Sequence, residues 1–108
     1  MASQKEEKIN KEMKKIFAQF IERESNRNSL ITVTRCKISK DLKHIKVFVS
    51  VLPEEEEAKA LAFLERRKWD ARDYMKKRIR IRILPFVEFL LDQGEKNRQK
   101  IDQLLKKV

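Results

Sequence analysis

The spacing of apolar residues changes along this 108-residue chain, and that change limits the possible folds more than any other feature. From residue 45 to residue 51, one Ile and three Val alternate strictly with Lys, Phe and Ser, the pattern of a strand with one face in a core. Before it, apolar residues recur every three or four positions, as on one face of an amphipathic helix. These residues are Ile9, Met13, Ile16, Phe17, Phe20 and Ile21. A helix and a strand within so short a chain indicate the α+β class and one small core.

Residues 30–52 predict a β-hairpin whose turn covers residues 39–43. The second arm of this hairpin contains the strict alternation. In the first arm, the apolar positions change parity at Thr34 and Arg35, so we expect a β-bulge there.

The second half of the chain predicts two helices, a strand and a last helix. Pro53 and the four carboxylates after it are typical of a helix start, and a second helical stretch covers residues 70–78. At residues 78–83, Arg and Ile alternate, so an extended chain would present three Arg on one face and three Ile on the other. A strand follows at residues 86–91, and the last helix has an apolar stripe over residues 101–108. The order is α-β-β-α-α-β with a C-terminal helix, which predicts a three-stranded mixed sheet with helices packed on one face.

Positive charge is concentrated between residues 66 and 82. The whole chain has a net charge of +10, and this segment has nine basic and two acidic side chains, a net charge of +7. The basic residues are Arg66, Arg67, Lys68, Arg72, Lys76, Lys77, Arg78, Arg80 and Arg82. A solvated charge run would normally have interleaved acidic residues, as residues 5–24 do. A concentrated positive field attracts polyanions by counterion release, so we expect these nine residues to bind the phosphates of a polyanion such as RNA.

Aromatic residues in or near this segment are candidates for stacking on RNA bases. Trp69 and Tyr74 lie within it, and for both of them core packing and base stacking remain open. Packing is slightly favoured for Trp69, because the apolar residues of the neighbouring helices need cover. Phe48 and Phe86 lie on alternating strands beside aliphatic residues, so we expect them to pack in the core.

The residues that enzymatic sites need are scarce in this sequence. Gly94 is the only glycine, which excludes a phosphate-binding loop and the GxxG loop of ordinary KH domains. Cys36 and His44 are the only residues of their types, which leaves no metal cluster. A nucleophile pair across the hairpin is the alternative to a core cysteine and a surface histidine, but no third orienting group is visible. We therefore expect no enzymatic activity, no cofactor and no small-molecule substrate.

The sequence also indicates the cellular compartment of the protein. No apolar run approaches the ~20 residues that span a bilayer, and residues 1–8 have no signal-peptide core. A single cysteine suits a reducing compartment. We expect a cytoplasmic monomer with no membrane contact, made of one domain over residues 1–108.

Two segments have the spacing of a known family. Residues 39–50 contain Ser39, the pair Asp41-Leu42 and the alternating valines. The second segment matches in continuous register at Arg72, Met75, Ile79, Ile81, Arg82, Pro85, Val87, Phe89 and Asp92. With the order of elements, these residues resemble the ribosome-binding factor A family, whose fold is a type II KH-like domain. The resemblance covers nearly the whole chain.

This chain departs from the family pattern at two places. Asn26-Arg27-Asn28 stands where the family usually has an Asp-Pro-Arg turn. Arg67-Lys68-Trp69 stands where the family usually has an Ala-x-Gly break between the middle helices, so the bulky Trp69 occupies the glycine position.

The resemblance implies a non-enzymatic assembly factor that binds the small ribosomal subunit and its rRNA. Such a factor acts in late maturation and rRNA processing and is often linked to growth in the cold. Two alternatives remain: a general KH-like nucleic-acid-binding module without ribosome specificity, and an adaptor whose basic face docks on an acidic protein.

Overall fold

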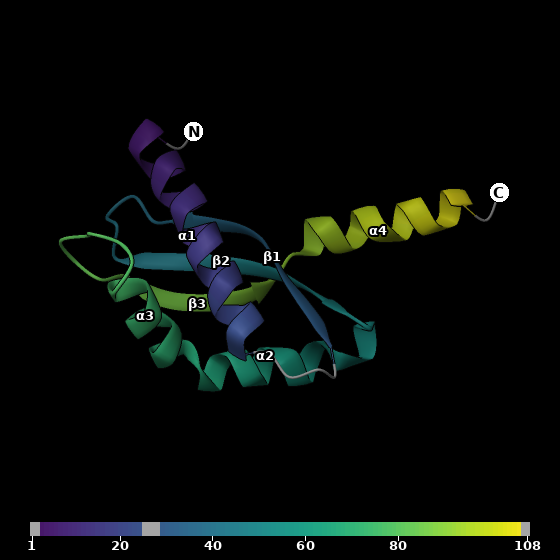
Figure 1. The fold of residues 1–108 in the computed structure, drawn as a ribbon. Helices are drawn as coiled ribbons and strands as arrows, with labels where there is room; N and C mark the ends of the chain where they lie inside the picture. The colour runs from purple at the N-terminus through teal and green to yellow at the C-terminus, as the bar shows by residue number, and fades with distance from the viewer. Residues whose placement is uncertain (1–2, 25–28, 107–108) are drawn as a thin grey trace.

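The computed structural model describes residues 3–24 and 29–106, which form four α-helices and one three-stranded sheet (Figure 1). In chain order the elements are α1 (Gln4–Glu24), β1 (Leu30–Ile38), β2 (His44–Leu52), a short 3₁₀ helix (Glu54–Glu56), α2 (Glu57–Arg66), α3 (Lys68–Lys76), β3 (Phe86–Leu91) and α4 (Gln93–Lys106). This order confirms the predicted one. Of the predicted loop at residues 25–29, residues 25–28 with Asn26-Arg27-Asn28 lie outside the described residues, as does Val108 at the end of the predicted stripe.

The sheet is mixed, as predicted, with β2 in the centre. β1 pairs antiparallel with β2, and β3 pairs parallel with it, so that Phe86 lies beside His44. The register of the β1–β2 pair shifts between Val33 and Arg35, which confirms the predicted bulge. The bulge reverses which face the later residues of β1 use, so that Cys36 as well as Val33 lies in the core.

One face of the sheet is covered by α1, α2 and α3 (Figure 1). On β2, Ile45 and Val47 are fully buried whereas Lys46 between them is exposed, as the alternation predicted. The stripe of α1 packs on this face, and the rings of Phe17 and Phe89 meet edge to face with their centroids 6.2 Å apart. The core therefore forms between α1 and the sheet, with α2 and α3 closing its side.

The two middle helices contribute small and aliphatic residues to this core. Ala60 and Leu64 of α2 are buried, and so are Ala71 and Met75 of α3. Trp69, in contrast, is 59% exposed. The expectation that Trp69 packs between the helices is wrong, because these four residues already fill the space on the core side.

The break between α2 and α3 is a single residue, Arg67. Its backbone φ of −103° is ordinary for any L-residue, and its N–H donates to the carbonyl oxygen of Leu64 at 3.0 Å. Its own carbonyl accepts the N–H of Ala71 at 2.9 Å and so begins the next helix. Trp69 lies inside regular α3, so no backbone conformation that favours glycine is needed at its position.

Residues 78–83 do not form a strand, although their alternation predicted one. They belong to the loop that connects α3 to β3, and β3 begins only at Phe86. Phe86 pairs with His44, the first residue of β2, and the residues before His44 form the tight β1–β2 turn. An extended segment ahead of Phe86 therefore has no neighbouring strand to supply hydrogen bonds. The alternation still separates the side chains, because Ile79 and Ile81 are half-buried whereas Arg80 and Arg82 are exposed.

The last helix, α4, extends away from the sheet, so only three of the four described helices pack on its face (Figure 1). Asp92, between β3 and α4, is buried: its carboxylate accepts a hydrogen bond from Thr34 Oγ1 at 2.6 Å and lies 3.4 Å from Arg35 Nε. Its N–H donates to the carbonyl oxygen of Val49 at 2.9 Å, which ties the start of α4 to the sheet. None of the described helices is long and apolar enough to cross a membrane.

Removing a core aromatic ring should cost far more stability than removing the exposed one. Phe17 is fully buried, so Phe17→Ala should lower the free energy of unfolding by about 3–5 kcal/mol. Trp69→Ala should lower it by less than about 1.5 kcal/mol, since most of that ring already faces solvent. Urea denaturation of both variants and the parent chain measures the two values. Equal losses for the two variants would contradict this account of the core.

Candidate nucleic-acid interface

The loop at residues 77–85 is fixed to α3 by Arg72. The guanidinium group donates from Nη2 to the carbonyl oxygen of Leu84 at 2.8 Å and from Nε to that of Pro85 at 3.1 Å. These two carbonyls have no strand partner at this point of the chain, and a planar guanidinium suits two neighbouring acceptors. Arg72 is therefore a structural residue as well as a cation of the basic segment.

A groove lies between the start of α1, the β1–β2 turn and this loop. Its volume is about 460 Å³. Its apolar floor consists of Ile9, Leu42, Ile79, Ile81 and Ile83. Its rim consists of the basic residues Lys5, Lys8, Arg80 and Arg82 and one acidic residue, Asp41. Three segments that are far apart in the sequence thus line one depression, and two of them, α1 and the loop, place four cations around it.

The turn on one side of this groove is braced by short hydrogen bonds. Ser39 Oγ donates to the Asp41 carboxylate at 2.6 Å, and the N–H of Lys43 donates to the same carboxylate at 3.0 Å. The hydrogen bond from Ser39, with that from Lys43, holds the pKa of Asp41 below its usual value, so the carboxylate is ionised at neutral pH. Leu42 has a left-handed φ of 63°, which places its half-buried side chain in the groove floor. The turn therefore holds one wall of the groove in a defined shape.

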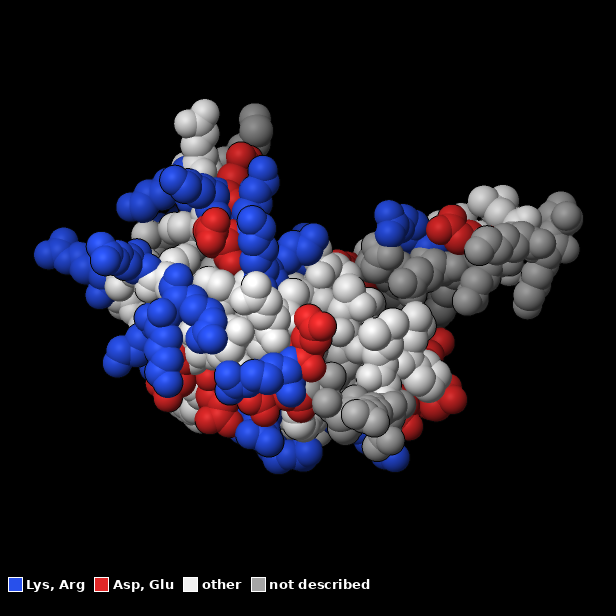
Figure 2. Space-filling model, viewed as in Figure 1, with Lys and Arg blue, Asp and Glu red and all other residues white. Residues whose placement is uncertain are grey.

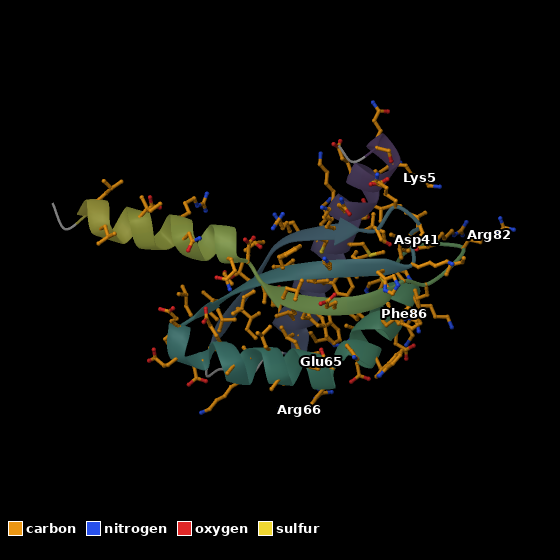
Figure 3. All side chains as sticks on the ribbon, turned by 180° about the vertical axis from the view of Figure 1, so that it is seen from behind. Lys5, Asp41, Glu65, Arg66, Arg82 and Phe86 are labelled. Atoms are coloured by element: carbon orange, nitrogen blue, oxygen red, sulfur yellow. The ribbon has the colours of Figure 1, made fainter. Side chains whose placement is uncertain are left out.

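Besides Arg72, the nine basic residues predicted to bind RNA divide into two groups. Arg80 and Arg82 lie on the loop at the groove, Lys77 and Arg78 are exposed earlier in the same loop, and Lys76 is exposed at the end of α3. The other group lies at the α2–α3 junction, where Arg67 Nη1 is 3.2 Å from Asp70 and Lys68 Nζ is 2.6 Å from Glu65. Arg66 is exposed at the end of α2, and Figure 3 shows it at a different edge of the molecule from Arg82.

Seen from outside, positive charge gathers at one end of the fold. Figure 2 shows Lys and Arg side chains clustered around the N-terminal half of α1 and the loop before β3, whereas acidic side chains are frequent along the lower edge. Figure 3 shows that Lys5 and Arg82 project at the same end of the molecule as Asp41. We call the residues Lys5, Lys8, Arg80 and Arg82 the basic end.

Tyr74, one of the two predicted stacking residues, already has its ring covered. The guanidinium carbon of Arg78 lies 3.3 Å from the ring centroid, and that of Arg23 lies 5.2 Å from it. The ring of Phe20 packs beside it with the centroids 5.5 Å apart. A base would have to displace an arginine in order to stack here, so the contacts favour a packing role for Tyr74.

Trp69, the other predicted stacking residue, belongs to an exposed aromatic cluster. Its ring meets Phe86 edge to face, with centroids 6.5 Å apart, and Phe86 lies 5.8 Å from the ring of His44. Phe86 is 52% exposed, so the expectation that it packs in the core is wrong. Phe86 alternates with Val87, which is buried on the covered face, so its own side chain points to the opposite face, where the side chains of Trp69 and Arg72 reach its ring. Phe48 also lies on that side, half-buried under Arg35 at 4.0 Å.

Cys36 and His44 do not form a nucleophile pair. Cys36 is a buried strand residue paired with Val47, and His44 is exposed at the start of β2. Burial raises the pKa of the Cys36 thiol to about 12, so it carries no thiolate at neutral pH. Among the described residues, no group of His, Cys, Asp and Glu side chains could hold a metal ion.

The sequence did not indicate two parts of this surface. Lys5 and Lys8 looked like the solvated face of an amphipathic helix, and only the packing direction of α1 brings them beside the loop. Phe86 looked like a core residue because its neighbours are aliphatic. Its place on the same face of β3 as the charged Glu88 was a signal that its side chain lies on the uncovered face of the sheet.

Comparisons with known proteins agree with this architecture. The family model described as ribosome-binding factor A matches residues 3–105. A ribosome-binding factor A of Natranaerobius thermophilus is 36% identical over 111 aligned positions, which cover 100% of this chain and 85% of that protein. The crystal structure of ribosome-binding factor A from Thermus thermophilus superposes with a TM-score of 0.72 at 30% identity, over 80% of this chain and 94% of that one. A Thermus thermophilus homology model fitted into a cryo-EM map of a complex of the 30S subunit with ribosome-binding factor A has a TM-score of 0.66 at 31% identity, over 76% and 89% of the two chains.

Cys36 should be inert in the folded protein. With a buried thiol and a pKa of about 12, its reaction with a thiol reagent at pH 8 should be about 100-fold or more slower than in the unfolded chain. Absorbance during labelling with and without guanidinium chloride measures both rates, and Cys36→Ser supplies the background. Rapid labelling of the native chain would contradict the buried position.

Replacing Arg72 should loosen the loop that carries the basic end. Lysine keeps the charge but cannot bridge two carbonyls with a planar fork, so Arg72→Lys should lower the free energy of unfolding by about 1–3 kcal/mol. Amide hydrogen exchange at residues 77–85 should become faster. Arg66→Lys, at an exposed position, is the matched control and should change neither quantity. Unchanged exchange in Arg72→Lys would show that the loop is held by other contacts.

Proposed function

Because this chain belongs to the ribosome-binding factor A family, we propose that it binds the small ribosomal subunit and its rRNA as an assembly factor during late maturation. The family model spans residues 3–105, and the similar solved structures include one fitted into a complex with the 30S subunit. The observation on this chain that carries the proposal is the basic end, where α1 and the loop before β3 place cations around one groove.

The mode of binding we propose follows from the side chains at this end. Without a glycine-rich loop the backbone has no cradle for phosphates, so the contacts must come from Lys and Arg side chains. Arg80 and Arg82 are exposed on a loop that Arg72 holds in place, which limits the conformational entropy that binding removes. Arg67 and Lys68 are already close to carboxylates and should contribute less to RNA binding than the basic end does.

We further propose that the protein acts by binding alone, as a monomer of one domain over residues 1–108, and that it works in the cytoplasm. The buried Cys36 thiol, which carries no thiolate at neutral pH, supports an activity without catalysis. The cytoplasmic location follows from the proposed partner.

An adaptor that docks on a protein is the second candidate, and one feature favours it. The groove has a floor of isoleucine and leucine side chains, which phosphates do not need but an acidic, partly apolar peptide would fill. We prefer RNA because the rim carries four cations against one carboxylate. Treatment with RNase separates the candidates, since a protein partner would remain bound.

The first test is sedimentation. A tagged copy expressed in its native cell should migrate with free or immature small subunits in a sucrose gradient at low salt, and the association should weaken as salt rises. Fractions are analysed by immunoblotting. A protein found only at the top of the gradient, in fresh extract at low salt, would overturn the proposed function.

The second test removes charge from the basic end. The double variant Arg80→Gln and Arg82→Gln should weaken binding to the small subunit and reduce the slope of log K against log salt by about 1.4–1.8, since each phosphate contact contributes about 0.7–0.9. The matched control is Lys59→Gln with Arg66→Gln, which removes the same charge from the exposed side of α2. If both pairs reduce the slope equally, the charge acts as a general field and the basic end is no specific site.

A further inference from the structure

We infer that Trp69, Phe86 and His44 form a stacking site for one unstacked base of single-stranded RNA. The inference rests on the proposed function and deepens it, because it assigns a ligand to a place that phosphate contacts do not use. The three residues come from three elements, His44 from β2, Trp69 from α3 and Phe86 from β3, and they lie at the start of β3 beside the loop.

The geometry of the two larger rings suits a planar ligand. Trp69 and Phe86 have an interplanar angle of 85° and a centroid distance of 6.5 Å, so the planes of the two rings are nearly perpendicular. A base stacked on one ring would place its edge against the other. The residues Trp69 and Phe86 are 59% and 52% exposed, so much of their surface is open to solvent, whereas the Tyr74 ring is covered by arginines.

Arg72 holds this corner in position. Its guanidinium carbon lies 4.6 Å from the centroid of Phe86 and 5.6 Å from that of Trp69, and its nitrogens donate to the two carbonyls just before Phe86. The cation therefore contacts both rings from a fixed place and orients them before a ligand arrives. In this role Arg72 is a positioning residue, and it links the rings to the loop that carries Arg80 and Arg82.

Charge around the rings favours RNA over a protein as the occupant. The N–H of Phe86 donates to the carbonyl of Lys43 at 2.9 Å, so the exposed Lys43 lies directly beside the cluster, and Arg82 is four residues before Phe86. Figure 3 shows Phe86 on the same end of the molecule as Arg82. A base on the rings would have its flanking phosphates among these cations. An apolar protein segment would gain only two rings and would bring no charge to match the cations.

Base stacking on exposed aromatic residues tolerates any sequence but requires an unpaired strand. In duplex RNA the bases are already stacked on one another, and the rings could reach only the backbone. The site would therefore make the protein prefer single-stranded segments over helices of the same charge. That preference distinguishes the stacking site from the phosphate contacts of the basic end, which do not need an unpaired base.

The experiment uses Trp69 itself as the probe, because it is the only tryptophan in the chain. Titration of the full chain with a single-stranded oligoadenylate should quench tryptophan fluorescence, and a duplex RNA of equal length should quench it much less. Because the Trp69 variants lack this signal, affinities of all variants are measured by the fluorescence anisotropy of an end-labelled RNA. By this readout, Phe86→Ala and Trp69→Ala should each weaken binding of the single strand by about 5- to 150-fold, the range for one stacked base. Both should leave duplex binding unchanged. Trp69→Phe should retain most of the affinity.

The control and the opposing outcomes separate this inference from the proposed function. Leu52→Ala removes another exposed apolar side chain, away from the rings, and should change neither RNA affinity. If the single strand binds with a steep salt dependence but without quenching, and the ring variants bind normally, the stacking site is overturned while the proposed function stands. If the parent chain binds no RNA and no small subunit, both fail. Ring variants that lose a protein partner but keep RNA binding would mark a protein-docking surface and overturn the inference.

Discussion

Parallel pairing between β2 and β3 forces the chain to travel the length of the sheet before it can return. Two strands that run in the same direction cannot be joined by a tight turn, so a long crossover is required, and here it consists of α2, α3 and the loop at residues 77–85. The crossover covers the side of the core that α1 leaves open. It also places Arg80 and Arg82 at the end of the sheet where β2 and β3 begin, beside the start of α1.

The crossover ends in a loop whose carbonyl groups have no neighbouring strand to donate hydrogen bonds to them. Arg72 donates to two of these carbonyls. One side chain thereby has three roles: it anchors the loop, it contacts Trp69 and Phe86, and it adds to the positive field. The contrast with Arg67 and Lys68 is instructive, because these residues lie in the same basic segment but direct their charge toward carboxylates. A cluster of basic residues in a sequence thus contains some cations that hold the fold together and others that are exposed and can bind phosphates.

The chain presents two kinds of surface at one end. The groove combines an apolar floor with a basic rim, and the aromatic corner of Trp69 and Phe86 lies on the other side of the same loop. Phosphate contacts give affinity that falls with salt, whereas stacking gives a preference for unpaired bases. An RNA with a single-stranded segment beside a helix would satisfy both surfaces together.

Periodicity alone determined the order of elements, the hairpin with its bulge and most of the core, because a period of two or of three to four residues reports which side chains must leave water. The sequence also indicated that Cys36 is a core residue, and the count of charges along the chain located the basic segment. Tertiary structure decided the rest. The alternation at residues 78–83 required a neighbouring strand, and the turn before His44 leaves none.

Periodicity likewise did not predict that Trp69 and Phe86 are exposed or that Lys5 and Lys8 lie beside the loop. Whether a ring on a helix or strand is buried depends on what lies over it, and Ala71 and Met75 had already filled the space under α3. Whether a lysine joins a site depends on which distant segment packs beside it. Local periodicity describes one element at a time, whereas a site is made by the angles at which several elements meet.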